Sequence, residues 1–293
     1  MRVARARSLR FCVVVLLTMA LDARAALVEQ QVQMPVSIVD AFGKHIEQAI
    51  TVTLFHDDAT PTPRPAIVIN HGRAGAAEER GAMGRARFPA ASAWFAKQGF
   101  LVAVPTRVGY GVTGGEDVED TGACGDRRFA PGFAAAADQV ASTLDLLRQR
   151  SDVDVERLVV LGQSFGGGTV VAVAARNPPG VVLAINFAGG SGGDPKNNPR
   201  NPCSPNRMES LYARYGHSAH VPMLWAYTEN DQYWGPKIPH EWFAAFTGGG
   251  ADAEFHQFTP HGTDGHLLFS RFPEVWQPVV ADFLRRHGFE IKE

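Results

Sequence analysis

The 293-residue sequence predicts an α/β fold, an eight-stranded and mostly parallel sheet with helices on both faces. Apolar or alternating segments of strand length recur along the chain, and helix-like segments alternate with them from residue 65 onward. With 45% hydrophobic and 20% charged residues, a chain of this length can bury one large core. We therefore expect a single domain over residues 26–293.

Eight strands are expected, and the first two have no helix between them, as in an antiparallel hairpin at one edge of a sheet. Their ranges are 32–39, 49–56, 65–70, 101–105, 157–162, 181–187, 221–227 and 253–258. The expected helices cover 88–98, 133–149, 165–177, 208–215, 239–247 and 274–287. The Gly-, Pro- and Asn-rich segment 189–207 is interpreted as an insertion after the sixth strand, because the alternation resumes beyond it.

Residues 1–25 have the features of a secretory signal peptide: an arginine-rich start, an apolar run over 11–21 and an A-x-A sequence at 23–25. The apolar run is shorter than the roughly 20 residues that a membrane span requires, so no span is expected. Cleavage would remove five arginines and one aspartate and take the formal net charge from −2 to −6. An acidic chain without a basic cluster does not favour nucleic acid as a partner. We expect a periplasmic or secreted protein.

The cysteines also bear on the compartment. Cleavage would remove Cys12 and leave Cys124 and Cys203, both in polar segments. An even pair in an oxidising compartment predicts a disulfide, and the alternative is two separate buried thiols.

A glycine-rich segment follows the fifth expected strand. Residues 162–166, Gly-Gln-Ser-Phe-Gly, have the G-x-S-x-G pattern of a nucleophile elbow, in which a serine stands on a tight strand-to-helix turn. Such a turn needs small neighbours, which Gly162 and Gly166 supply. The alternative is the glycine-rich turn of a nucleotide-binding domain, but neither phosphate-binding glycine pattern fits here. Ser164 is therefore the candidate nucleophile.

The loop after the third expected strand contains His71-Gly72-Arg73. Because the carboxyl ends of parallel strands share one edge of the sheet, this loop and Ser164 should meet there. The N–H of Arg73 and that of Phe165 would form a two-donor oxyanion hole. The alternative is an ordinary glycine turn.

An acid and a histidine are available in later loops at the same edge. After the seventh strand the acid is Asp231 or Glu229, and Asp231 is preferred because it lies deeper in the loop. After the last strand the histidine is His266 or His261, and the residues alone leave both open. The chain order Ser, acid, His is that of the serine hydrolases whose nucleophile stands on such an elbow.

At this point the sequence resembles the α/β-hydrolase superfamily, in particular secreted serine esterases of the dienelactone-hydrolase-like or prolyl-oligopeptidase-like type. The resemblance runs from about residue 45 to 288 and rests on "VINHG", "VAVPTRVGYGVTGG", "LGQSFGG", "YTENDQYWGP", "DGHLLF" and "VWQPVVADFL". It implies an α/β-hydrolase fold and the histidine of "DGH", His266, as the catalytic one. Dienelactone hydrolases proper use a cysteine nucleophile, so Ser164 does not carry dienelactone chemistry over to this chain.

These expectations combine into a serine hydrolase that cleaves a carboxylic ester of a small molecule through an acyl-enzyme, with no metal or organic cofactor. Tyr110, Tyr233 and Trp234 are expected to line the substrate pocket. A peptidase or amidase acting on short peptides comes second, because the propeller domain of prolyl oligopeptidases has no counterpart in this sequence. A noncatalytic binding protein on a hydrolase scaffold comes third. The sequence leaves the oligomeric state open.

Overall fold

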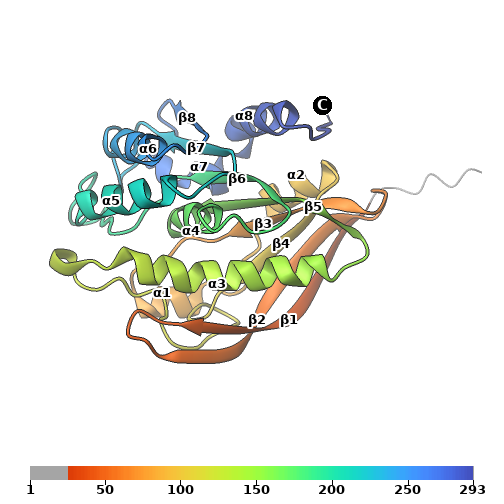
Figure 1. Cartoon of the computed structure of the whole chain (residues 1–293), viewed down its shortest axis with the longest axis horizontal. Coiled ribbons are helices and arrows are strands. Elements are labelled where there is room, and N and C mark those ends of the chain that lie inside the picture. The colour runs from red at the N-terminus through yellow and green to blue at the C-terminus, as the bar shows by residue number, and fades with distance from the viewer. Residues whose placement is uncertain (1–25, 293) are drawn as a thin grey trace, which may run out of the picture.

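One sheet of eight strands organises the protein. The computed structural model describes residues 26–292, so the expected signal peptide over 1–25 lies outside the described residues. The strand order is β1-β2-β4-β3-β5-β6-β7-β8. β1 pairs antiparallel with β2 and β2 antiparallel with β4, whereas all the other neighbours are parallel. The predicted mostly parallel sheet, with a hairpin at one edge, is confirmed (Figure 1).

The strands are β1 (Leu27–Val39), β2 (His45–Asp57), β3 (Arg64–Asn70), β4 (Leu101–Thr106), β5 (Val153–Gln163), β6 (Val181–Phe187), β7 (Met223–Thr228) and β8 (Ala253–Phe258). The helices are α1 (Ala77–Ala82), α2 (Pro89–Lys97), α3 (Phe129–Arg148), α4 (Phe165–Ala174), α5 (Pro205–Gly216), α6 (Ile238–Gly248), α7 (Leu268–Arg271) and α8 (Pro273–Arg286). The prediction missed only α1 and α7, whose six and four residues are too few to show a helical period.

Helices cover both faces of the sheet, because alternate residues of each parallel strand point to opposite sides. In β5, Leu158 and Val160 pack with α3, α4, α5 and α6 in one core cluster. Val159 and Leu161 pack with α2 and α8 in the second. All four of these β5 side chains are fully buried, which explains why β5 reads as a continuous apolar run in the sequence.

The parallel strands share one direction, so their carboxyl ends lie at a single edge of the sheet. β3, β5, β7 and β8 there lead into the loops that contain His71, Ser164, Asp231 and His266. Figure 1 shows α3 running back across the sheet to the start of β5 at the opposite edge. No helix within residues 26–292 is long and apolar enough to cross a bilayer.

Candidate active site

Ser164 stands between the end of β5 and the first residue of α4. Its backbone has φ 59° and ψ −124°, a conformation that L-residues rarely adopt. The N–H of Ser164 donates to the carbonyl of Phe187 at 2.8 Å, and its own carbonyl accepts from Gly168 and Gly190. This strained turn therefore holds the serine at the tip of the strand-to-helix junction.

Gly162 and Gly166 are needed because backbone passes close on both sides of this turn. A methyl group on Gly162 would overlap the carbonyl of Gly166. A methyl group on Gly166 would overlap the carbonyl oxygens of Asn70 and His71, at the end of β3. The glycines around Ser164 thus allow β3, β5 and α4 to meet.

Asp231, in the loop after β7, is hydrogen-bonded to His266. His266 Nδ1 donates to Asp231 Oδ2 at 2.9 Å, and the Asp231 side chain is fully buried. Asp231 Oδ1 also accepts from the N–H groups of Tyr233 at 2.7 Å and Trp234 at 3.1 Å. Glu229 is exposed instead, so the structure brings the preferred acid, and not the alternative, to His266.

His266 is fixed on several sides. The ring of Tyr233 stacks on the imidazole with centroids 3.8 Å apart, and Trp234 meets it edge-on at 5.6 Å. Asp264 accepts the N–H of His266 at 3.0 Å, and Gln163, the neighbour of Ser164, donates to its carbonyl at 2.9 Å. These contacts give the ring a single orientation.

The second ring nitrogen of His266, Nε2, has no hydrogen-bond partner among residues 26–292, although it is buried. Because Nδ1 donates to a carboxylate, Nε2 is the unprotonated nitrogen and can take a proton. His261 differs, since its Nδ1 lies 2.7 Å from the carbonyl of Thr259 and its ring packs beside Phe272.

Ser164 and His266 open onto the same cleft, whose volume is about 1060 Å³. Arg73, Phe165, Tyr233 and Trp234 also line it. Of the three aromatic residues expected in the pocket, the structure therefore brings Tyr233 and Trp234 to the cleft. Trp234 is 1% exposed, and its indole N–H donates to the carbonyl of Ala188 at 2.8 Å.

Tyr110 does not line the cleft, and this expectation from the sequence is corrected. Its side chain is 1% exposed, and its hydroxyl donates to Glu119 at 2.6 Å. The ring packs edge-on against His71, with centroids 4.5 Å apart. Tyr110 thus lies behind the loop that follows β3, because a buried carboxylate satisfies its hydroxyl there.

The two expected oxyanion donors lie in segments that border Ser164. The N–H groups of Arg73 and Phe165 donate no hydrogen bond within the described part of the chain. A methyl group on Gly72 would stand 3.6 Å from Ser164 Oγ, which shows how near this loop comes to the serine. Free N–H groups beside a nucleophile are suited to bind a developing negative charge.

The side chain of Arg73 points to Asp117, not to Ser164. Both Nη atoms donate to the carboxylate, at 2.5 and 2.6 Å, and Arg80 adds an ion pair at 2.9 Å. Burial opposes ionisation of Asp117, but the bonds from Arg73 together with the charges of Arg73 and Arg80 outweigh it and lower the pKa of this carboxyl. The guanidinium of Arg73 thus anchors the loop that contains the expected oxyanion donor.

A buried polar network that sequence reasoning missed supports this loop from behind. Arg107 and Glu119 form an ion pair with both side chains fully buried. Arg107 Nη1 donates to the carbonyl of His71 at 2.8 Å, and its backbone N–H donates to His71 Nε2 at 3.2 Å. Burial, and then the charge of Arg107, lower the pKa of His71 well below its ordinary value, so this imidazole stays neutral.

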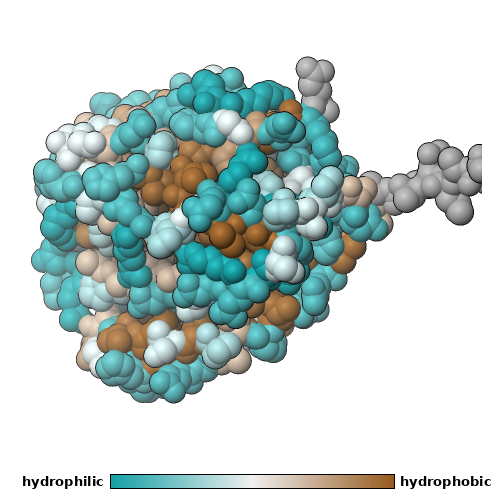
Figure 2. All heavy atoms as spheres, turned by 45° about the vertical axis from the view of Figure 1, so that its right-hand side comes forward, coloured by the Kyte–Doolittle hydropathy of each residue, from teal (hydrophilic) through white to brown (hydrophobic). Residues whose placement is uncertain are grey.

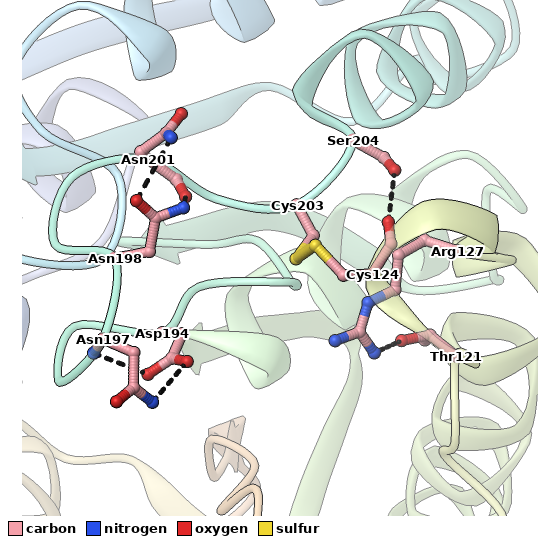
Figure 3. The surroundings of a disulfide bond; sticks show 9 residues. All are labelled: Thr121, Cys124, Arg127, Asp194, Asn197, Asn198, Asn201, Cys203 and Ser204. Atoms are coloured by element: carbon pink, nitrogen blue, oxygen red, sulfur yellow. Dashed lines mark hydrogen bonds between the residues drawn. A yellow bond between two sulfur atoms is a disulfide. The ribbon is translucent and has the colours of Figure 1, made fainter.

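A disulfide joins two segments that border the cleft (Figure 3). Cys124 lies in the segment between β4 and α3 and Cys203 in the insertion between β6 and α5, so the expected bond is present. Ser204 Oγ adds a hydrogen bond to the carbonyl of Cys124 at 3.0 Å. The first segment lines the cleft with Thr121 and Arg127, and the second lines it with residues 190–197.

The rim of the cleft is tied to the first strand. Glu29, on β1, forms ion pairs with Arg85, at 2.5 Å, and with Arg87. Both arginines line the cleft. β1 thus fixes the position of two cationic side chains at the cleft rim.

Three comparisons place the chain among known proteins. The curated proteins it matches include the "Uncharacterized protein YfhR" of Escherichia coli K12, 34% identical over 61 residues, which are 21% of this chain and 22% of that protein. The YfhR of Salmonella typhimurium LT2 is 44% identical over 48 residues, 16% of each chain. The chain thus spans about a fifth of the length of these relatives or less.

Several solved structures share the fold at low sequence identity. A putative dienelactone hydrolase from Klebsiella pneumoniae has a TM-score of 0.55 at 15% identity, covering 89% of this chain and 98% of that chain. An acetyl xylan esterase from Paenibacillus sp. R4 has a TM-score of 0.57 at 16% identity, covering 89% of each. An acylaminoacyl peptidase from Pyrococcus horikoshii has a TM-score of 0.59 at 14% identity, covering 91% of this chain and 43% of that chain.

The family comparison covers most of the chain. The sequence profile described as "Dienelactone hydrolase family" matches residues 50–262, from β2 to the loop after β8. The matched range includes Ser164 and Asp231 and ends four residues before His266. With the eight-stranded sheet and the serine at its strand-to-helix turn, this match shows that the chain belongs to the dienelactone hydrolase family of the α/β-hydrolase superfamily and is a hydrolase.

Proposed function

We propose that this hydrolase cleaves a carboxylic ester of a small molecule through an acyl-enzyme formed on Ser164. The observation that carries the proposal is the bond between Asp231 and His266, which leaves Nε2 of the imidazole without a partner in the cleft that Ser164 lines. A histidine that is held by a carboxylate at one ring nitrogen and shares a cleft with a serine is suited to activate that hydroxyl as a nucleophile.

The reaction then proceeds in two stages. Ser164 Oγ attacks the carbonyl carbon while His266 Nε2 takes the hydroxyl proton, and the N–H groups of Arg73 and Phe165 bind the oxyanion. The tetrahedral intermediate breaks its bond to the alcohol oxygen, which leaves with the proton from His266. Water, deprotonated by the same nitrogen, then attacks the acyl carbon. This second tetrahedral intermediate breaks its bond to Ser164 Oγ, which takes the proton back from His266 as the carboxylic acid leaves. Asp231 stabilises the imidazolium in both stages.

Ser164 is tested with a fluorophosphonate probe and a p-nitrophenyl ester. We expect wild-type protein to be labelled and to release p-nitrophenol, and Ser164→Ala to lose both while keeping its circular dichroism spectrum. Ser270→Ala is the matched control, because Ser270 also lines the cleft but its hydroxyl donates to the carbonyl of Leu267. Folded wild-type protein that neither reacts with the probe nor turns over esters would support a noncatalytic binding protein.

The base is tested by comparing the two histidines. His266→Ala should lower kcat by about 10⁴-fold or more, as the loss of a catalytic-triad member does in serine proteases. His261→Ala removes a histidine that lies outside the cleft and should leave kcat close to wild type. The opposite result would move the base to His261.

The choice between ester and amide is tested with a substrate panel. We expect p-nitrophenyl esters of short acyl chains to have higher kcat/KM than aminoacyl anilides, whose leaving group is poorer. A preference for the anilides would identify a peptidase.

A further inference from the structure

A second cleft, of about 580 Å³, lies toward the amino ends of the parallel strands, whereas Ser164 lies at their carboxyl ends. Its lining includes the first residue of β3, Arg64, and Arg157 on β5, together with Arg285 and Lys292 from the end of the chain. Gln163 lies six positions after Arg157 on β5, about 20 Å along the strand. Figure 2 turns the right-hand side of Figure 1 toward the viewer and shows apolar patches among hydrophilic residues on that side.

The charge of this second cleft is unbalanced. Arg64, Arg157, Arg285 and Lys292 line it, and Glu290 is the one acid among the described residues that do so. None of these four cations has a carboxylate within 4.0 Å in the described part of the chain. Arg286, next in sequence to Arg285 but outside the second cleft, does pair, with Glu254 at 2.5 Å and Asp282 at 2.9 Å. With four unpaired cations and one acid on its lining, the second cleft has an excess of positive charge.

Arg64 is the most unusual of the four, because it is buried as well as unpaired. The residue is 6% exposed, and Nη1 donates only a long bond, 3.3 Å, to the carbonyl of Asp57. Its Nε is buried and has no partner among the described residues, and the same is true of Thr60 Oγ1 on the same lining. Buried polar atoms, charged ones above all, cost free energy unless something binds them.

The second cleft also holds its cations in place and offers them an apolar neighbour. The Arg157 guanidinium stands 4.6 Å from the ring centre of Phe289 and donates to the carbonyl of Gly288 at 2.9 Å. Phe289 and Phe100 are buried and line the cleft together with Pro61. A ligand that meets both surfaces has acceptor oxygens at one end and an apolar body at the other.

We propose that this second cleft binds a small organic anion through its carboxylate or phosphate group. The oxygens accept from Arg64 Nε and Thr60 Oγ1 and pair with Arg157, Arg285 and Lys292, while the apolar part packs on Phe289. The site shares no residue with the catalytic cleft, so its test is independent of the test of the proposed esterase activity.

Isothermal titration of the purified protein tests the site with inorganic phosphate, benzoate and benzyl alcohol. We expect saturable binding of both anions, tighter for benzoate because of its ring, and none of the neutral alcohol. Anion binding should weaken as sodium chloride is added, since added salt screens ionic contacts. The titrations extend to roughly 10 mM anion, because at an ionic strength of that order the Debye length is still about 30 Å and screening is weak. No saturable binding of either anion over this range would overturn the proposal.

Variants then locate the bound anion. The double variant Arg157→Gln/Arg285→Gln should bind benzoate at least tenfold more weakly than wild type. Lys292→Gln should weaken binding less, because Lys292 is exposed. Arg286→Gln is the matched control and should bind like wild type. Ester hydrolysis should stay unchanged in all three. If Arg127→Gln, in the catalytic cleft, abolished binding while the double variant kept it, the anion would belong to the catalytic cleft and the proposal would be wrong.

Discussion

At the scale of single residues, we expect Asp231 to determine which ring nitrogen of His266 carries the proton. Its carboxylate accepts from His266 Nδ1 and from the N–H groups of Tyr233 and Trp234. Asp231→Asn keeps the shape but presents an amide that can donate to Nδ1, which favours the wrong tautomer. We expect kcat to fall by about 10⁴-fold, as in the equivalent serine-protease variant.

The control for this prediction is Glu229→Gln, because Glu229 is exposed and has no bond to His266. Its kcat should stay near wild type. Steady-state hydrolysis of a p-nitrophenyl ester measures kcat for both variants, and a crippled Glu229→Gln beside an active Asp231→Asn would reverse the assignment.

The sequence was sufficient to predict candidate site residues that lie in loops directly after a strand. Ser164, Asp231 and His266 each follow an expected strand, so parallel topology predicts that their loops meet, whereas the choice of His266 over His261 came from the resemblance. Tyr110 was misplaced because its direction depends on Glu119, nine residues later, and no local pattern encodes that bond. The buried pair of Arg107 and Glu119 was missed for the same reason, although a charged residue directly after an apolar strand is a usable signal.

At the scale of elements, the disulfide connects two long segments that would otherwise move independently. Replacing both cysteines, as Cys124→Ser/Cys203→Ser, should lower the free energy of unfolding by about 2–4 kcal/mol, because 79 residues separate them and the unfolded chain gains freedom. Both segments line the cleft, so KM should rise more than kcat falls. Urea unfolding and ester kinetics measure the two effects.

Reduction of wild-type protein provides the control for that variant, since it breaks the same bond without changing a side chain. Dithiothreitol should reproduce the rise in KM and should have no further effect on the double variant. Equal KM values in all three states would show that the two cleft segments hold their positions without the bond.

Strands were predicted more completely than helices for a physical reason. The inner strands are buried on both faces and therefore stand out as short apolar runs. α1 and α7 are too short for a periodic pattern, and their positions depend on contacts such as that of Arg80 with the carbonyls of Ala74 and Gly75. α3 begins at Phe129, earlier than predicted, because Pro131 and Gly132 obscure its first turn and yet fit it.

At the scale of the whole molecule, stability should depend on the neutral state of His71. Burial and Arg107 lower its pKa in the folded protein, whereas the unfolded chain has the ordinary value of 6.5. Below that pH the unfolded state binds the proton more readily than the folded state does. The contribution of neutral His71 to the free energy of unfolding is therefore complete above about pH 6.5 and is lost as the pH falls toward the folded pKa. The melting temperature should drop by roughly 2–4 °C for each kcal/mol lost.

The matched variants for this effect are His71→Asn and His45→Asn. The first removes the titrating ring from the loop after β3, so its melting temperature should change less between pH 7 and pH 5 than that of wild type. The second removes an exposed ring and should follow the wild-type curve. Parallel curves for wild type and His71→Asn would show that another group causes the acid sensitivity.

The ion pairs of Glu29 with Arg85 and Arg87 bear on where the autonomous hydrolase unit begins. The family match starts at residue 50, inside β2, yet the cleft rim depends on a carboxylate from β1. A fragment cut at that boundary would lose all of β1 and the first five residues of β2, and it would leave both arginines without their carboxylate. We therefore expect that the smallest fragment with an intact cleft includes the first hairpin, because β1 supplies the carboxylate that holds two of the side chains lining that cleft.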